Sequence, residues 1–343
     1  MEFRLAFIGF GTVGRGLMQL LTEKQSELKK LQNFQFKTIA IHDIILGTVY
    51  NENGIDGKLA LDLVENKKSL SEHPDFAEGW DSEKIITETS SNVIVEITPT
   101  NIKTGEPGLT HVRTALKNKK HVVTTNKGPV ALAVKELNNL AVENGVEFRF
   151  EGTVMSGTPV FHLTETGLSG AEIKRVRGIL NGTTNYILTQ MENGIGYEEA
   201  LRDAQLKGYA EAVPDADVLG WDAKAKVLIM ANVLMGANLK EQDIPCEGIT
   251  KITLEDIQNA RSNHKRWKLI GSVEKTDSGV SASVKPLELP ENDFLAGIAG
   301  VTNALSFDTD TLGEVTIIGP GAGKIETGFS LLTDLLAINR NQS

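Results

Sequence analysis

The segment FIGFGTVGRGL, residues 7–17, decides the fold class because its glycines have the spacing of a turn that cradles phosphate. Gly9 and Gly11 would let the backbone turn tightly and approach a pyrophosphate, and Gly14 would let a helix pack closely on the preceding strand. Glycine-rich turns also occur for purely structural reasons. Here a strand-like run precedes the turn and an amphipathic helix follows it, which favours a dinucleotide bound at the helix N-terminus.

Strands and helices alternate outward from this turn. The pattern predicts strands over 3–8, 36–44, 92–100, 121–127 and 146–154, and helices over 14–31, 110–120 and 129–145. This alternation indicates an α/β fold with a Rossmann-type, doubly wound parallel sheet. Residues 46–88 are polar and irregular, and their pattern does not place any element.

The pattern changes after about residue 155, where helical and strand-like runs mix. Helices are expected over 195–207, 222–237 and 253–262, and strands over 172–180 and 279–289. We therefore expect a dinucleotide-binding domain over 1–154 and a second, α+β domain over 155–318. The glycine turn GPGAG and the apolar helix after it, within 319–343, would fold back onto the first domain.

The composition argues against several classes of protein. The 343 residues carry a net charge of −10, which argues against a nucleic-acid binder. Lys117, Lys119 and Lys120 are read as charges that complement the dipole at a helix end. The apolar runs are too short for a membrane span, no secretory signal is visible, and a single cysteine rules out an internal disulfide. These features predict a cytoplasmic protein.

Asp43 stands at the end of the second predicted strand, where an acidic residue can bind the adenosine ribose. It lies 29 positions after Gly14, farther than the usual distance of about 20 residues. A solvated loop aspartate is the alternative interpretation. No arginine follows nearby to hold a 2′-phosphate, so the sequence favours NAD slightly over NADP.

The segment GYAEAVPDADVLGWDAKAK, residues 208–226, gathers several carboxylates and a lysine. Asp222 and Lys226 are four residues apart and would share a helix face, where a surface ion pair is the simplest interpretation. The helix continues as VLIMANVLM, apolar on every side, so Lys226 enters a buried region. A buried ammonium needs a partner, either Asp222 or Glu211, and a partly buried lysine between carboxylates is a candidate proton donor.

At this point the chain resembles homoserine dehydrogenase over nearly its whole length. The resemblance rests on motifs in order: GFGTVGRGL, TTNKGP (124–129), EGTVMSGTP (151–159), NGTTNYI (181–187), the 208–226 cluster and GPGAG (319–323). Val213 departs from the family, which usually has a small polar or acidic residue before the proline. The resemblance is to the short form, without a fused aspartate kinase or a C-terminal regulatory domain.

The resemblance implies reversible, NAD(P)H-dependent reduction of L-aspartate 4-semialdehyde to L-homoserine, on the route to threonine and methionine. Lys226 would be the proton donor, with Asp222 and Lys127 as further catalytic residues. The family pattern places the amino-acid end of the substrate near Glu211, Asp217, Asp222 and Thr183. Because a developing alkoxide needs a nearby acid, a lysine suits this role.

The resemblance also implies the cofactor and cation sites. NAD or NADP would contact Gly9, Phe10, Gly11, Thr12, Val13, Gly14, Asp43, Thr98, Lys127, Gly208, Glu211 and Gly323. A sodium-like monovalent cation would be held, mainly by backbone carbonyls, at Glu151, Val154, Ser156 and Thr158. The second domain is similar to one that dimerises through its sheet, so we expect a homodimer.

Two other functions stay open. One is a different NAD(P)-dependent dehydrogenase acting on another aldehyde of amino-acid metabolism. The other is a dinucleotide-binding regulatory protein without catalysis. An intact Asp222–Lys226 pair speaks against the second, because a sensor has no need of a proton donor.

Overall fold

The computed structural model describes residues 2–342, which form two compact units. The first unit runs to Gly157 and resumes at Gly323, and the second unit spans Thr158–Ala322. The sequence pattern predicts these boundaries between the units at 154/155 and at 318/319 instead.

The first unit is built on a mainly parallel sheet with the strand order β3-β2-β1-β4-β5-β6. Its strands are β1 (Glu2–Ile8), β2 (Gln35–Asp43), β3 (Gly47–Tyr50), β4 (Val93–Glu96), β5 (His121–Thr124) and β6 (Phe148–Arg149). Neighbouring strands from β2 to β6 run parallel, and β3 pairs antiparallel at the edge. The Rossmann-type sheet expected from the glycine turn is confirmed. Strand order reverses between β1 and β4, which is where such sheets bind ligands.

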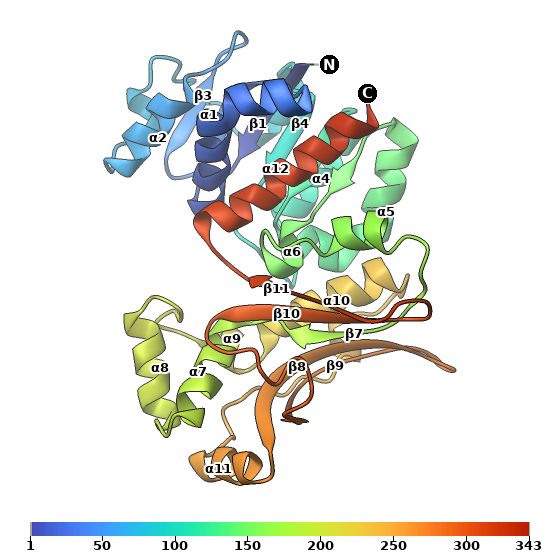
Figure 1. The fold of residues 1–343 in the computed structure, drawn as a ribbon. Coiled ribbons are helices and arrows are strands. Elements are labelled where there is room, and N and C mark those ends of the chain that lie inside the picture. Colours follow the sequence, from blue (N-terminus) through green and yellow to red (C-terminus); the bar gives the residue numbers. More distant parts are fainter. Residues whose placement is uncertain (1, 343) are drawn as a thin grey trace. The chain divides into compact units, whose positions relative to one another are not determined.

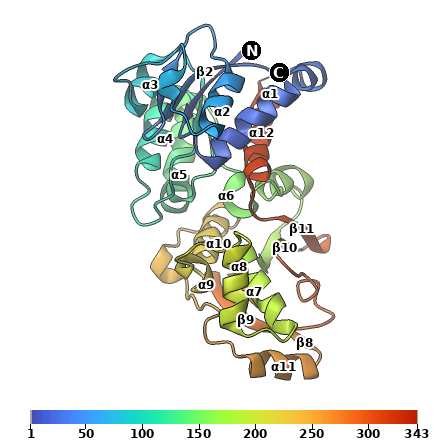
Figure 2. The same cartoon turned by 90° about the vertical axis from the view of Figure 1, so that its left-hand side faces the viewer.

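Helices cover this sheet. They are α1 (Thr12–Gln32), α2 (Gly57–Glu65), α3 (Ser82–Glu88), α4 (Gly108–Lys117), α5 (Lys127–Asn144), α6 (Gly152–Met155) and α12 (Lys324–Asn341), with a 3₁₀ turn at Leu70–Glu72. Both views show α12 alongside α1, although the two helices come from opposite ends of the chain (Figures 1 and 2). Leu17 and Leu21 of α1 and Leu331 and Leu335 of α12 join one buried core, so apolar burial stabilises this pairing.

The prediction of a strand over 146–154 is wrong for most of that range. Only Phe148–Arg149 forms a strand, and Gly152–Met155 forms a short helix. The carbonyl oxygen of Phe150 accepts hydrogen bonds from the backbone N–H and the hydroxyl of Thr153, at 3.2 and 2.8 Å. This local turn satisfies the carbonyl without a neighbouring strand, so the chain leaves the sheet.

The interpretation of Lys120 as a helix-end charge is also wrong. Its side chain is buried, and its Nζ donates to the Thr89 carbonyl at 2.8 Å and to Ser91 Oγ at 2.9 Å. Burial lowers the pKa of Lys120 to about 8. Lys117 and Lys119 are exposed, as a solvated helix end requires.

The second unit is an α+β unit with an antiparallel sheet of order β11-β10-β7-β8-β9. Its strands are β7 (Ile173–Ile179), β8 (Lys265–Thr276), β9 (Gly279–Pro290), β10 (Thr302–Thr309) and β11 (Gly313–Pro320). Its helices are α7 (Gly182–Glu192), α8 (Tyr197–Leu206), α9 (Asp215–Val218), α10 (Trp221–Leu234) and α11 (Leu254–Ser262), with a π turn at Leu163–Gly167 and a 3₁₀ turn at Glu241–Asp243. α10 packs on β8 and β9, and α7 packs on β8 and β10 (Figure 2).

Within residues 2–342, no helix combines the length and the apolar character that crossing a membrane would need.

Candidate active site

The glycine turn lies between β1 and α1, beside the carboxyl end of β4. Gly9 has a φ of +100°, and a Cβ built there would lie 2.7 Å from the Ile97 carbonyl oxygen, so only glycine fits. A Cβ at Gly11 would meet nothing within 4 Å, which leaves open space beside the backbone. α1 begins at Thr12, and among the described residues no side chain caps it.

These features fit a dinucleotide. Uncapped N–H groups at a helix start are anion-binding donors, and the open space at Gly11 lets a phosphate approach the backbone. Phe10, Thr12, Val13 and Gly14 stand on the same turn and first helical turn. The structure therefore brings all the predicted turn residues together at the point where the strand order reverses.

Asp43 lies at the end of β2 and contacts the turn directly. Its Oδ2 accepts a hydrogen bond from Phe10 N at 2.9 Å, and its Oδ1 accepts from the backbone N–H groups of Ile45 and Leu46 at 2.9 and 3.1 Å. The carboxylate is thus an ordered part of the site rather than a solvated loop charge. Ile44 and Ile45, which follow it, are 92% and 86% exposed.

Thr98 and Lys127 follow neighbouring parallel strands. Thr98 comes two residues after β4, and Lys127 is the first residue of α5, three residues after β5. Both therefore stand at the ligand-binding edge of the sheet. Gly323, at a φ of +139°, precedes α12 in the same unit.

Lys226 and Asp222 form an ion pair on α10 in the second unit, in which Lys226 is buried and Asp222 is half-buried. Lys226 Nζ lies 2.7 Å from Asp222 Oδ2 and 2.6 Å from the Leu180 carbonyl oxygen. The Lys226 side chain is only 9% exposed, because the rest of α10 is apolar and packs on β8 and β9. Of the two partners expected for this ammonium, the structure shows Asp222. Glu211 is exposed.

Asn181 joins this pair to a second carboxylate. Its Nδ2 donates to Asp217 Oδ1 at 2.7 Å and lies 3.2 Å from Asp222 Oδ2. Burial raises the pKa of Asp217, the Asn181 hydrogen bond opposes this shift, and the nearby Asp222 carboxylate adds to it. Asn181 therefore holds the two carboxylates beside the Lys226 ammonium.

Asn181 lies within the NGTTN motif, whose sequence indicated no role for it. The available signal was its position before a helix: its Oδ1 accepts from Thr184 N at 2.9 Å and so caps α7.

Thr183, Gly208 and Glu211 lie near this cluster in sequence, and α7 meets the 208–211 loop. The Thr183 hydroxyl donates to the Tyr209 carbonyl at 2.6 Å, and the Glu211 carbonyl accepts from Gln205 Nε2 at 3.1 Å. Thr183 therefore holds the backbone of this loop. Gly208 is exposed and has a φ of +74°.

The residues expected to hold a cation fall in both units. Glu151, Val154 and Ser156 are buried in the first unit, and Ser156 Oγ lies 2.7 Å from Thr327 Oγ1. Thr158 opens the second unit, where its hydroxyl donates to the Pro320 carbonyl at 3.1 Å.

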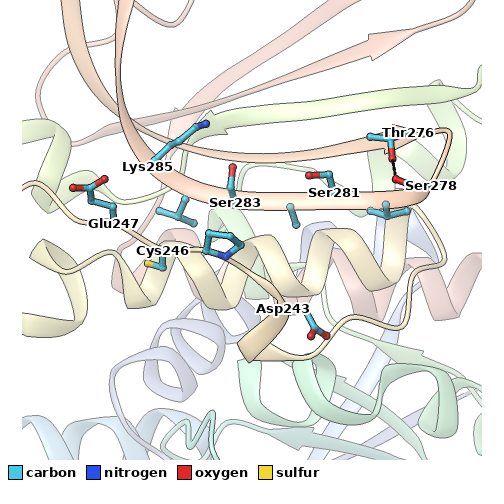
Figure 3. Close-up of a pocket in the computed structure, with 12 residues that line it drawn as sticks. Asp243, Cys246, Glu247, Thr276, Ser278, Ser281, Ser283 and Lys285 are labelled. Carbon is cyan, nitrogen blue, oxygen red and sulfur yellow. Dashed lines mark hydrogen bonds between the residues drawn. The ribbon is translucent and has the colours of Figure 1, made fainter.

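A hollow of about 590 Å³ runs along β9 in the second unit (Figure 3). It is lined by β9 residues, including Ser281, Ser283 and Lys285, and by the segment from Asp243 to Glu247. None of the predicted site residues lines it. The candidate sites are therefore the Lys226–Asp222 pair in the second unit and the glycine turn in the first unit, and not this hollow.

Comparisons with known families agree with these two sites. A family model described as homoserine dehydrogenase matches residues 159–336, and one described as homoserine dehydrogenase, NAD binding domain, matches residues 9–151. The first range contains the Lys226 cluster, and the second contains the glycine turn.

Individual proteins are similar over the full length. An NAD(+)-dependent homoserine dehydrogenase from Pseudomonas canavaninivorans is 45% identical over 99% of this chain and 97% of its own. A homoserine dehydrogenase from Methanocaldococcus jannaschii is 40% identical over 97% of this chain and 98% of its own. The solved structure of a hyperthermophilic archaeal homoserine dehydrogenase in complex with NADPH has a TM-score of 0.85 at 30% identity, covering 99% of this chain and 98% of that one.

Proposed function

The chain belongs to the homoserine dehydrogenase family, and we propose that its reaction depends on the ion pair of Lys226 and Asp222. The protein is an NAD(P)-dependent oxidoreductase that acts on a CH–OH group. Family membership disfavours both a dehydrogenase for another aldehyde and a regulatory protein without catalysis. The observation that carries the proposal is the position of the buried Lys226, whose Nζ lies 2.7 Å from Asp222 Oδ2.

In the reducing direction, Lys226 donates a proton to the aldehyde oxygen of L-aspartate 4-semialdehyde. The nicotinamide ring, when bound, supplies the hydride to the aldehyde carbon. As that bond forms, negative charge develops on the oxygen, and the ammonium stabilises it and then transfers its proton. The product is the alcohol, L-homoserine. In oxidation the neutral amine of Lys226 takes the hydroxyl proton back.

Asp222 holds Lys226 in place, and the carboxylates around it bind the amino-acid end of the substrate. Asp222 and the Leu180 carbonyl each accept a hydrogen bond from Lys226 Nζ, which fixes where the ammonium points. Asp217 and Glu211 supply counter-charges for the substrate α-ammonium, and Thr183 supports the loop that contains Glu211. A specific ammonium site excludes aldehydes that lack this group.

The glycine turn and the residues after β4 and β5 bind the dinucleotide. Gly9 to Gly14 receive the pyrophosphate, and Thr98 and Lys127 stand at the same edge of the sheet for the nicotinamide half. Gly208, Glu211 and Gly323 remain predicted cofactor contacts. Lys127 adds a positive charge near the reacting groups.

The substrate assignment is tested by following NADH and NADPH oxidation with L-aspartate 4-semialdehyde and with aldehydes that lack the α-ammonium. We expect kcat/KM for aspartate semialdehyde to exceed that for the deaminated aldehydes by at least about 10²-fold, because the carboxylates of Asp217 and Glu211 would lose the ammonium group that they bind. Equal turnover of the deaminated aldehydes would contradict the roles given to Asp217 and Glu211. No turnover of aspartate semialdehyde would contradict the proposed reaction.

We expect NADH to be the better coenzyme, by roughly tenfold or more in kcat/KM, because the Asp43 carboxylate would face a 2′-phosphate. The loop after β2 has Ile44 and Ile45 where a cation would be needed. Ile44→Arg should raise kcat/KM for NADPH, and since position 44 is 92% exposed, the fold tolerates this change.

Val142→Arg is the matched control. It adds the same charge at an 80% exposed apolar position on α5 and should leave the coenzyme preference unchanged. A wild-type preference for NADPH would remove the role given to Asp43.

The monovalent cation at Glu151, Val154, Ser156 and Thr158 stays a prediction, as do the homodimer and the cytoplasmic location.

A further inference from the structure

Glu96 is a fully buried carboxylate at the carboxyl end of β4, and the reaction above does not use it. Its exposed fraction is 0%, and it lies two residues before Thr98. Buried carboxylates are retained only with hydrogen-bond partners, so its contacts indicate what it does.

One carboxylate oxygen of Glu96 holds the loop after β4. Oε1 accepts a hydrogen bond from Thr98 N at 3.2 Å and a second one from the Thr98 hydroxyl. His111 Nδ1 of α4 lies 3.5 Å from the same oxygen, and His111 Nε2 lies 2.9 Å from Ser82 Oγ at the start of α3. The backbone of Thr98 is therefore fixed to two helices through a single carboxylate.

The other oxygen reaches the loop after β5. The Thr124 hydroxyl lies 3.2 Å from Glu96 Oε2 and 2.7 Å from the Glu96 carbonyl oxygen, and it accepts from Asn126 N at 3.0 Å. Asn126 Oδ1 then accepts from Gly128 N at 3.1 Å, which caps α5 at its first residue, Lys127. Glu96 thus fixes the start of α5 through Thr124 and Asn126.

Asn126 closes the network between the two loops. Its Nδ2 lies 3.3 Å from the Thr98 carbonyl oxygen and 3.4 Å from the Thr98 hydroxyl. A Cβ at Gly108 would lie 3.2 Å from Glu96 Oε2, so the backbone at the start of α4 approaches the carboxylate closely. Thr98 and Asn126 are therefore held in one arrangement.

We propose that Glu96 is a positioning residue that holds Thr98 and the start of α5, with Lys127, in the conformation that binds the nicotinamide half of the cofactor. This inference rests on the proposed function, which places Thr98 and Lys127 at that site. Glu96 does not touch the cofactor. It satisfies the buried donors behind the binding surface, and precise binding surfaces depend on such supporting hydrogen bonds.

The test compares Glu96→Ala with the conservative variant Glu96→Gln. Alanine leaves the Thr98 N–H without its acceptor, so the loop should rearrange. Glutamine keeps one oxygen for Thr98, and its amide N–H can donate to the Thr124 hydroxyl. We expect the Kd for NADH, measured by NADH fluorescence, to rise about tenfold or more in Glu96→Ala and to stay within about threefold of wild type in Glu96→Gln.

Lys120→Met is the matched control. It alters a buried polar group at the opposite, amino ends of β4 and β5, where Lys120 bonds the Thr89 carbonyl and Ser91. Its Kd for NADH should stay within about twofold of wild type whatever happens to its Tm, since it does not support either loop. All titrations are run well below the Tm of each variant.

If Glu96→Ala does not fold, Thr124→Val replaces it in the NADH-binding test. It keeps the side-chain volume and removes the hydroxyl that links Glu96 to Asn126. The Kd for NADH should therefore rise by about threefold or more. With folded Glu96→Ala, a Kd within twofold of wild type would overturn the inference, as would equal weakening by Lys120→Met. Wild-type protein that binds neither NADH nor NADPH would instead overturn the proposed function and the inference with it.

Discussion

Lys226→Met should lower kcat for the reduction of L-aspartate 4-semialdehyde by roughly 10²–10⁴-fold, the contribution typical of a positioned general acid. Methionine fills a similar volume in the apolar surroundings of α10, but it has no proton to give. The Kd for NADH should change little, because the glycine turn lies in the other unit and keeps its own contacts. Steady-state kinetics with a fluorescence titration of NADH would measure both quantities.

Lys226→Arg separates proton transfer from charge. A guanidinium can keep the ion pair with Asp222, yet it does not release a proton at physiological pH. If Lys226 is the proton donor, kcat should stay low in this variant too. If Lys226→Arg retains kcat within about fivefold of wild type, the ammonium acts only as a charge, and the proton comes from elsewhere.

The glycine turn and the alternation of strands and helices were sufficient to predict the parallel sheet, because both signals are local. Buried parallel strands such as β4 and β5 are short apolar runs, and each is followed by a helix. The segment 46–88 gave no such signal. Its helices α2 and α3 are short. The N-cap residues Asp56 and Asp81 are the only local signal that predicts where these helices begin. Its strand β3 depends on pairing with β2, which the sequence of β3 does not specify.

Asp222 was one of two predicted partners for Lys226, beside Glu211, and its prediction rested on helical spacing, which is reliable within one helix. Contacts that join distant segments are different. Asn181 bridges Asp217 and Asp222 across 36 and 41 positions, and no periodicity encodes such a distance. Glu96 looked like part of a strand, and its role depends on Thr124, which is 28 residues away. Lys120 looked exposed, because three lysines close together in sequence suggest a solvated helix end.

Gly9→Ala should raise the Kd for NADH by about 10²-fold or more and should also destabilise the first unit. An alanine at a φ of +100° is strained by about 1–3 kcal/mol, and its Cβ would lie 2.7 Å from the Ile97 carbonyl oxygen. The turn must therefore move. The bonds from Gly9 N to the His42 carbonyl and from Phe10 N to Asp43, 2.8 and 2.9 Å long, would then weaken. Thermal unfolding and NADH titration would record the two effects.

Gly11→Ala distinguishes loss of binding from loss of folding. Gly11 has a φ of −72°, and an added Cβ meets nothing within 4 Å, so the free energy of unfolding should fall by less than about 1 kcal/mol. The same methyl group occupies the space through which a pyrophosphate would approach the start of α1. NADH affinity should therefore fall at nearly unchanged Tm. If Gly11→Ala binds NADH as wild type does, the open space at Gly11 is not the phosphate site, and weak binding by Gly9→Ala would reflect only the distorted turn.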